Sequence, residues 1–120
     1  MNKTIKLLCS VSLIFGAQSA LACDYPQRVV VPNGTTATKD DMLAGQRGVK
    51  KFVEDMEVYL ECIVDEEKMA RAGMENISAE DEQQREDALN KKYNAAVDEM
   101  ERIAAQFNVE VQAYRAKESS

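Results

Sequence analysis

The chain contains no histidine and no tryptophan among its 120 residues. Without histidine it lacks the imidazole ligand of haem and of many zinc sites, the base of serine-type triads and the commonest general base. Its five glycines are scattered rather than gathered into a phosphate-binding loop. These absences exclude several enzyme classes, and we predict a non-enzymatic protein with no catalytic residue, metal or cofactor.

Basic residues are also in short supply, with 15 Lys and Arg against 21 Asp and Glu. Lys3 and Lys6 are the only charged residues before Cys23, so a chain beginning at Cys23 has 13 basic and 21 acidic residues, or a charge of −8. A nucleic-acid binder needs a basic face to displace counterions. The balance therefore argues against nucleic acid as a partner and favours cationic protein surfaces.

Long apolar runs are absent except near the start of the chain. Residues 1–22 combine Lys3 and Lys6, an apolar run over 7–15 and the small-x-small sequence Ala20-Leu21-Ala22. This is the pattern of a cleaved secretory signal peptide, and the run is shorter than the roughly 20 residues that span a bilayer. We predict export to the periplasm, cleavage after Ala22 and no transmembrane segment in the mature chain.

Only three cysteines are present, and Cys9 lies in the predicted signal peptide. The remaining pair, Cys23 and Cys62, predicts one disulfide in an oxidising compartment. The alternative is a lipid anchor on Cys23, because residues 19–23 loosely resemble a lipoprotein signal. They depart from that signal at Ala20, where it has leucine, and lipidation would leave Cys62 as a free thiol.

Residues 23–37 predict an extended arm. Pro26 and Pro32 are unsuited to a helix interior, the valines at 29–31 favour extended backbone, and Asn33-Gly34 signals a turn. Fifteen extended residues reach about 50 Å, whereas Thr38 and Cys62 lie about 36 Å apart along a helix. The arm is therefore long enough to run back beside the first helix and reach Cys62.

Two long amphipathic helices are predicted after the arm, at 39–72 and 79–116. Thr38 and Ser78 are their N-caps, and Gly73 ends the first helix as a left-handed residue. Apolar residues recur every seven positions, as in a coiled coil. The predicted core or interface residues are Met42, Val49, Phe52, Met56, Tyr59, Leu60, Ile63, Leu89, Tyr93, Ala96, Met100, Ile103 and Phe107.

The short link between the helices makes them antiparallel neighbours. The predicted fold is therefore all-α: a two-helix hairpin over 38–118, with the arm tied to the first helix by the disulfide. Opposite charges lie four residues apart on the second helix, which predicts ion pairs on an exposed face at Asp81–Arg85, Asp87–Lys91 and Asp98–Arg102. Two helices have a thin core, so pairing of two hairpins into a four-helix dimer is a second way to cover the seam.

Several short motifs also carry a resemblance. Cys23, the proline-containing arm, Ala37-Thr38 at the helix entry, Phe52 and the run 59–62 look like a group of small exported proteobacterial helical proteins of unknown function. The resemblance covers residues 23–63 and supports the Cys23–Cys62 link and the helical fold. It implies no activity.

Three functional hypotheses follow from the sequence. The first is a structural or interaction protein of the periplasm with an unknown protein partner. The second is an inhibitor or immunity-type binder of a basic envelope or secreted protein, because the charge of −8 steers the chain toward cationic surfaces. The third is a lipid-anchored envelope protein.

Overall fold

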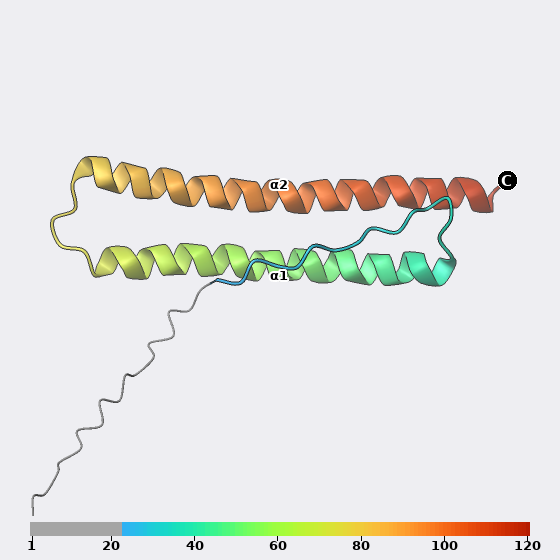
Figure 1. The fold of residues 1–120 in the computed structure, drawn as a ribbon, viewed down its shortest axis with the longest axis horizontal. Helices are drawn as coiled ribbons and strands as arrows, with labels where there is room; N and C mark the ends of the chain where they lie inside the picture. Colours follow the sequence, from blue (N-terminus) through green and yellow to red (C-terminus); the bar gives the residue numbers. More distant parts are fainter. Residues whose placement is uncertain (1–22) are drawn as a thin grey trace, which may run out of the picture.

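The computed structural model describes residues 23–120, so the predicted signal peptide and its cleavage site lie outside the described residues. Two helices, α1 (Lys39–Ala72) and α2 (Ala79–Glu118), lie side by side and antiparallel (Figure 1). No strand is present in residues 23–120. The predicted all-α hairpin is confirmed. The first helix has the predicted bounds, and the second extends two residues beyond the expected end at 116.

Both helices begin at the predicted caps. The Thr38 side chain accepts from the Asp41 N–H at 3.1 Å, and the Asp41 carboxylate accepts from the Thr38 N–H at 2.8 Å. This reciprocal pair is a capping box that satisfies two backbone N–H groups, and the hydrogen bond from the Thr38 N–H lowers the pKa of Asp41. Ser78 accepts from the Asp81 N–H at 3.1 Å. Each helix start is thus set by residues three positions apart.

The end of α1 differs from the sequence prediction. Gly73 is right-handed, with φ −86°, and the left-handed residue is Asn76, with φ 56°. The Met74 N–H donates to the Arg71 carbonyl at 3.0 Å, so the last turn tightens instead of reversing at Gly73. The chain therefore turns three residues later, at an asparagine whose short polar side chain tolerates the left-handed region.

The core is formed by one row of apolar side chains on α1, which packs against small and branched side chains of α2. Ala96 and Ile103 are the buried residues of α2. Tyr59, Leu89, Met100 and Phe107 are half-buried beside the core. The predicted residues that are buried on α1 are Met42, Val49, Phe52, Met56, Leu60 and Ile63.

Tyr93 is a correction to the predicted core, because 39% of the residue is exposed. Two helices meet along one line, so a residue turned off that line is covered only where a third segment lies over it. No such segment covers Tyr93 in the described chain, and its ring forms part of an open surface.

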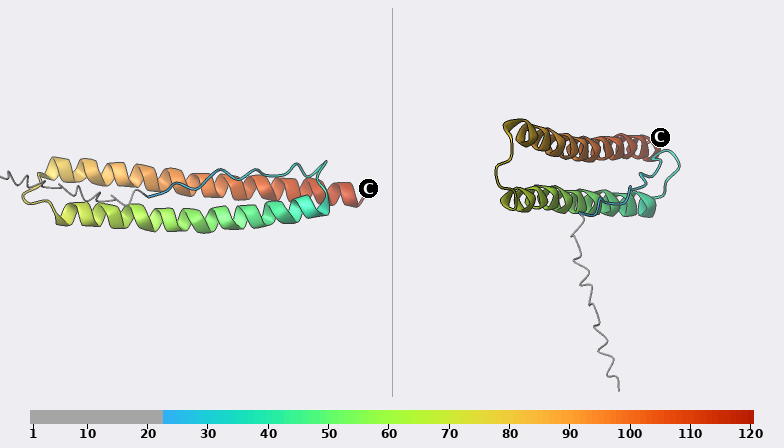
Figure 2. Two further views of the ribbon diagram at one scale, coloured as in Figure 1. Left: turned by 60° about the horizontal axis from the view of Figure 1, so that its bottom comes forward. Right: turned by 60° about the vertical axis from the view of Figure 1, so that its left-hand side comes forward.

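The arm, residues 23–37, lies over one of the two seams between the helices. It begins beside Cys62, runs along the pair and reaches the start of α1 near the C-terminal end of α2 (Figure 1). The two views in Figure 2 show it on the same side of the pair over its length. The hairpin thus has one covered seam and one open seam.

Candidate interaction surface

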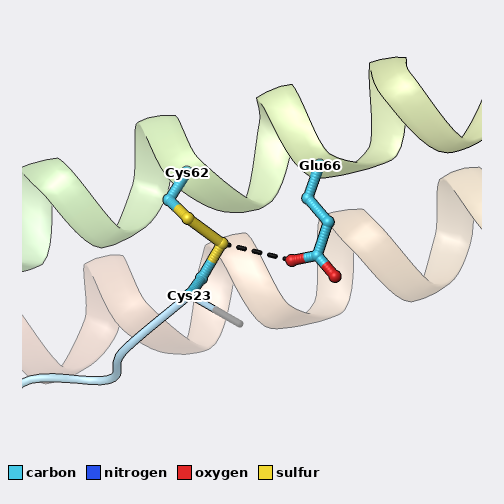
Figure 3. Close-up of a disulfide and its surroundings, with 3 residues drawn as sticks. All are labelled: Cys23, Cys62 and Glu66. Atoms are coloured by element: carbon cyan, nitrogen blue, oxygen red, sulfur yellow. Dashed lines mark hydrogen bonds between the residues drawn. A yellow bond between two sulfur atoms is a disulfide. The ribbon is translucent and has the colours of Figure 1, made fainter. Parts of the chain in front are cut away.

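A disulfide between Cys23 and Cys62 fixes the start of the arm (Figure 3). The Glu66 side chain, one helical turn beyond Cys62, lies with a carboxylate oxygen 3.2 Å from the Cys23 Sγ. A bonded sulfur has no proton to donate, so this is a contact between a disulfide and a carboxylate. The carboxylate places a negative charge directly beside the disulfide.

Aromatic and glycine contacts then hold the arm against α1. The rings of Tyr25 and Tyr59 meet edge to face, with their centres 5.0 Å apart. Further along, an added Cβ at Gly45 would lie 2.6 Å from the Pro32 ring. Pro32 of the arm can therefore pack this closely against α1 only because Gly45 has no side chain.

The far end of the arm is bound to α2. The Gly34 N–H donates to a carboxylate oxygen of Glu110 at 2.6 Å. Lys117 donates to the Ala37 carbonyl at 2.5 Å, and its ammonium group lies 4.7 Å from the centre of the Tyr114 ring. The arm is therefore attached to α1 by a disulfide at its start and to α2 by polar contacts at its end.

An ion-pair cluster joins the helices at the opposite end of the hairpin. Arg85 of α2 binds both carboxylate oxygens of Glu67 on α1, at 2.9 and 3.0 Å, and Arg71 donates to the same group at 3.0 Å. The predicted pair Asp81–Arg85 is wrong, because the antiparallel packing brings Glu67 within reach. Hydrogen bonds from Arg71, then from Arg85, lower the pKa of Glu67.

Arg102 also differs from its predicted pairing with Asp98. It binds both carboxylate oxygens of Glu99, at 2.7 and 2.9 Å. Positions three and four residues apart on a helix are both within reach, and the bidentate geometry forms here with the residue three positions back.

The seam that the arm does not cover is a shallow groove of about 590 Å³. Its apolar part is formed by Leu60 and Val64 of α1 and by Tyr93 of α2. Helical spacing continues the apolar surface to Val53 on α1 and Val97 on α2, both of which are half-buried. The groove therefore has an apolar floor along the outer side of both helices.

One edge of this groove is acidic. Glu57, Glu61 and Asp65 follow one another at four-residue steps along α1, and Lys68 stands beyond them toward the hairpin turn. Among the ion pairs within residues 23–120, none includes any of these three carboxylates. We name this surface the open groove. The residues that line it are Glu57, Leu60, Glu61, Val64, Asp65, Lys68 and Tyr93.

Leu60 is in the core as predicted and also lines the groove, whereas Tyr93 was predicted in the core and is exposed in the groove. The signal that identifies the groove is a second apolar stripe, Val53–Leu60–Val64, adjacent to the central row of α1. Its exposure depends on which seam the arm covers, so the stripe alone does not define a surface.

No helix within residues 23–120 has the length and apolar character needed to cross a membrane. Comparisons with protein-family models, with curated proteins and with solved structures find no match for this chain.

Proposed function

We propose that this chain is a non-enzymatic interaction protein of the periplasm. The observation that supports the proposal is the asymmetry of the hairpin: one seam is closed by the arm, and the other presents the open groove. A surface held on capped helices costs little ordering entropy when a partner binds.

The attachments at both ends of the hairpin support this proposal. The disulfide and the Lys117 contact hold the arm, while the Glu67–Arg85 pair holds the helices together at the turn. These contacts hold together the two helices that carry Val64 and Tyr93. A preorganised surface of this kind lowers the entropy cost of binding a partner.

Site-specific photocrosslinking in the cells that make the protein tests this function. A photoreactive residue replaces Val64 in the open groove, and the matched control replaces Val58, which is 66% exposed on another face of α1. We expect a discrete crosslinked protein from position 64 and none from position 58. Absence of any crosslinked protein from positions around the whole hairpin would contradict the proposal.

Export and the lipid-anchored alternative need a separate measurement. The intact mass of protein purified from the cell envelope is compared before and after reduction. A chain that begins at Cys23 and gains two hydrogens on reduction supports export, cleavage and the disulfide. A mass raised by fatty acyl groups supports the lipid anchor instead, since an acylated Cys23 sulfur cannot also bond to Cys62.

The binder of a basic protein, whether an inhibitor or an immunity-type protein, is a second candidate function. The acidic edge of the open groove favours it, because Glu57, Glu61 and Asp65 give one face of α1 a local excess of negative charge. Association with such a partner slows as the salt concentration rises. Crosslinking yields that do not change between low and high salt would contradict this candidate.

A further inference from the structure

We infer that the open groove binds one cationic amphipathic helix of a partner protein. The inference rests on the proposed interaction function and assigns both the face and the chemistry of what binds there. It depends on three properties of the groove: its apolar floor, the spacing of its carboxylates and its length.

The floor fits the apolar side of a helix. Leu60 and Val64 stand one turn apart on α1, and Tyr93 faces them from α2. Two helices packed side by side leave a furrow of this shape, and a third helix that lies in it completes a three-helix bundle. The partner therefore presents apolar residues at helical spacing, such as i, i+3, i+4 and i+7.

The acidic edge determines the charge of the partner. Glu57, Glu61 and Asp65 are separated by four residues each, which is about 6 Å of rise per step. Lysines or arginines four residues apart on a facing helix have the same spacing. Because these carboxylates make no ion pair within residues 23–120, they are available to a cationic partner.

The length of the groove limits the size of the bound segment. The α1 residues that line the groove run from Glu57 to Lys68, which is eleven steps along the helix or about 16 Å. A bound helix therefore needs about three turns in contact. Such a segment is short enough to belong to a larger basic protein that docks through one helix.

A second copy of this chain fits the groove less well. In a two-fold symmetric pair the same patch lies on both sides of the interface, so an axis that passes close to Glu57, Glu61 and Asp65 brings the acidic edges of the two copies together. Like charges placed opposite one another oppose association. The predicted four-helix dimer is therefore the competing outcome of the test, not the occupant that we infer.

The test uses the mature chain, residues 23–120, and an 18-residue helical peptide built from leucine and lysine as the probe. We expect chemical-shift changes confined to the open groove, with affinity falling as salt rises. The same peptide with glutamate in place of lysine should not bind. Sedimentation equilibrium of the protein without peptide measures whether two copies associate.

Two matched variants separate groove binding from net charge. The groove variant carries Glu57→Gln, Glu61→Gln and Asp65→Asn, and the control carries the exposed substitutions Glu75→Gln, Asp98→Asn and Glu118→Gln. Both change the net charge equally. We expect about a tenfold weaker affinity for the groove variant and less than a twofold change for the control. Matching far-UV spectra confirm that both variants are folded.

Three results would overturn the inference: no binding of the lysine peptide, equal weakening in both variants, or a dimer that buries Val64 and Tyr93. The proposed interaction function has a separate readout. If crosslinking identifies a partner on another face while the peptide leaves the groove unperturbed, the interaction function stands and the groove inference is wrong. If peptide binding is weakened in the groove variant and no cellular crosslink is found, the groove has the inferred binding chemistry but the proposed interaction function is wrong.

Discussion

The backbone N–H of Gly34 donates to the side chain of Glu110, 76 residues later in the chain, at 2.6 Å. This bond places the turn of the arm directly on α2. An added Cβ at Gly34 would overlap the Glu110 carbonyl oxygen and meet the Tyr114 nitrogen at 2.8 Å. Glycine is therefore needed at position 34 for close approach of two backbones, not for a left-handed conformation.

The first prediction concerns this contact. Gly34→Ala should lift the turn from α2 and destabilise the protein by about 1–3 kcal/mol, as overpacking does. The matched control is Gly73→Ala, where an added Cβ would lie 3.7 Å from the Ala70 oxygen, an ordinary contact, and the backbone is right-handed. That control should leave stability unchanged or raise it slightly. Urea unfolding of both variants measures the difference, and equal midpoints would contradict the prediction.

The second prediction concerns the disulfide. It closes a loop with a sequence separation of 39 residues, for which the chain-entropy model gives about 4 kcal/mol. The double variant Cys23→Ser/Cys62→Ser should therefore melt at a lower temperature and keep its helical far-UV spectrum, because the caps at Thr38 and Ser78 remain.

The same variant also tests how the arm is attached. Its first residues should lose the Tyr25–Tyr59 contact, while Gly34 stays bound to Glu110. Amide hydrogen exchange at Gly34 reports whether the far end stays bound. Loss of protection at this amide in the double variant would show that the polar contacts at the far end do not hold without the disulfide.

The third prediction concerns pH. Hydrogen bonds from Arg71 and Arg85 hold the pKa of Glu67 below its usual range, so the folded chain binds this proton less readily than the unfolded chain. Its contribution to stability is complete above the ordinary carboxyl pKa and is lost as pH falls through the lowered value. Glu67→Gln should cost about 1 kcal/mol at neutral pH and flatten the decrease in stability toward acid.

Urea unfolding at several pH values measures this effect. Asp41 and Glu99 also have lowered pKa values, so the wild-type protein loses stability in acid for more than one reason. The difference between wild type and Glu67→Gln isolates one carboxyl group. Glu75→Gln, at an exposed position in the link between the helices, is the control. A difference that stays constant from neutral pH to acid would contradict the role of Glu67.

The fourth prediction concerns the carboxylate beside the disulfide. Reduction begins when a thiolate attacks a sulfur atom, and the Glu66 charge near the Cys23 Sγ repels it. Glu66→Gln should speed reduction by glutathione about threefold at low salt and have less effect with cysteamine, whose amine is cationic. Glu61→Gln, on the groove side of α1, is the control. Equal acceleration by both thiols would show that charge is not the cause.

Local features of this fold could be predicted from the sequence. The N-caps at Thr38 and Ser78 and the bounds of α1 depend on hydrogen bonds between residues at most four positions apart. The central row of α1 follows from its seven-residue apolar period. The partner of Cys23 was also predictable, because Cys62 is the only other cysteine after the predicted cleavage site.

The tertiary structure decided the features that make a surface. Arg85 binds Glu67 instead of Asp81, Gly34 lies on Glu110, and Tyr93 is exposed on the uncovered seam. These relationships depend on how the two helices are rotated about their axes and on the side along which the arm runs. Helical periodicity identifies an apolar stripe but not the segment that covers it. For this reason the sequence alone determined two capped helices and the disulfide that joins the arm to α1. Only the packing of the arm determined which seam between the helices stays open.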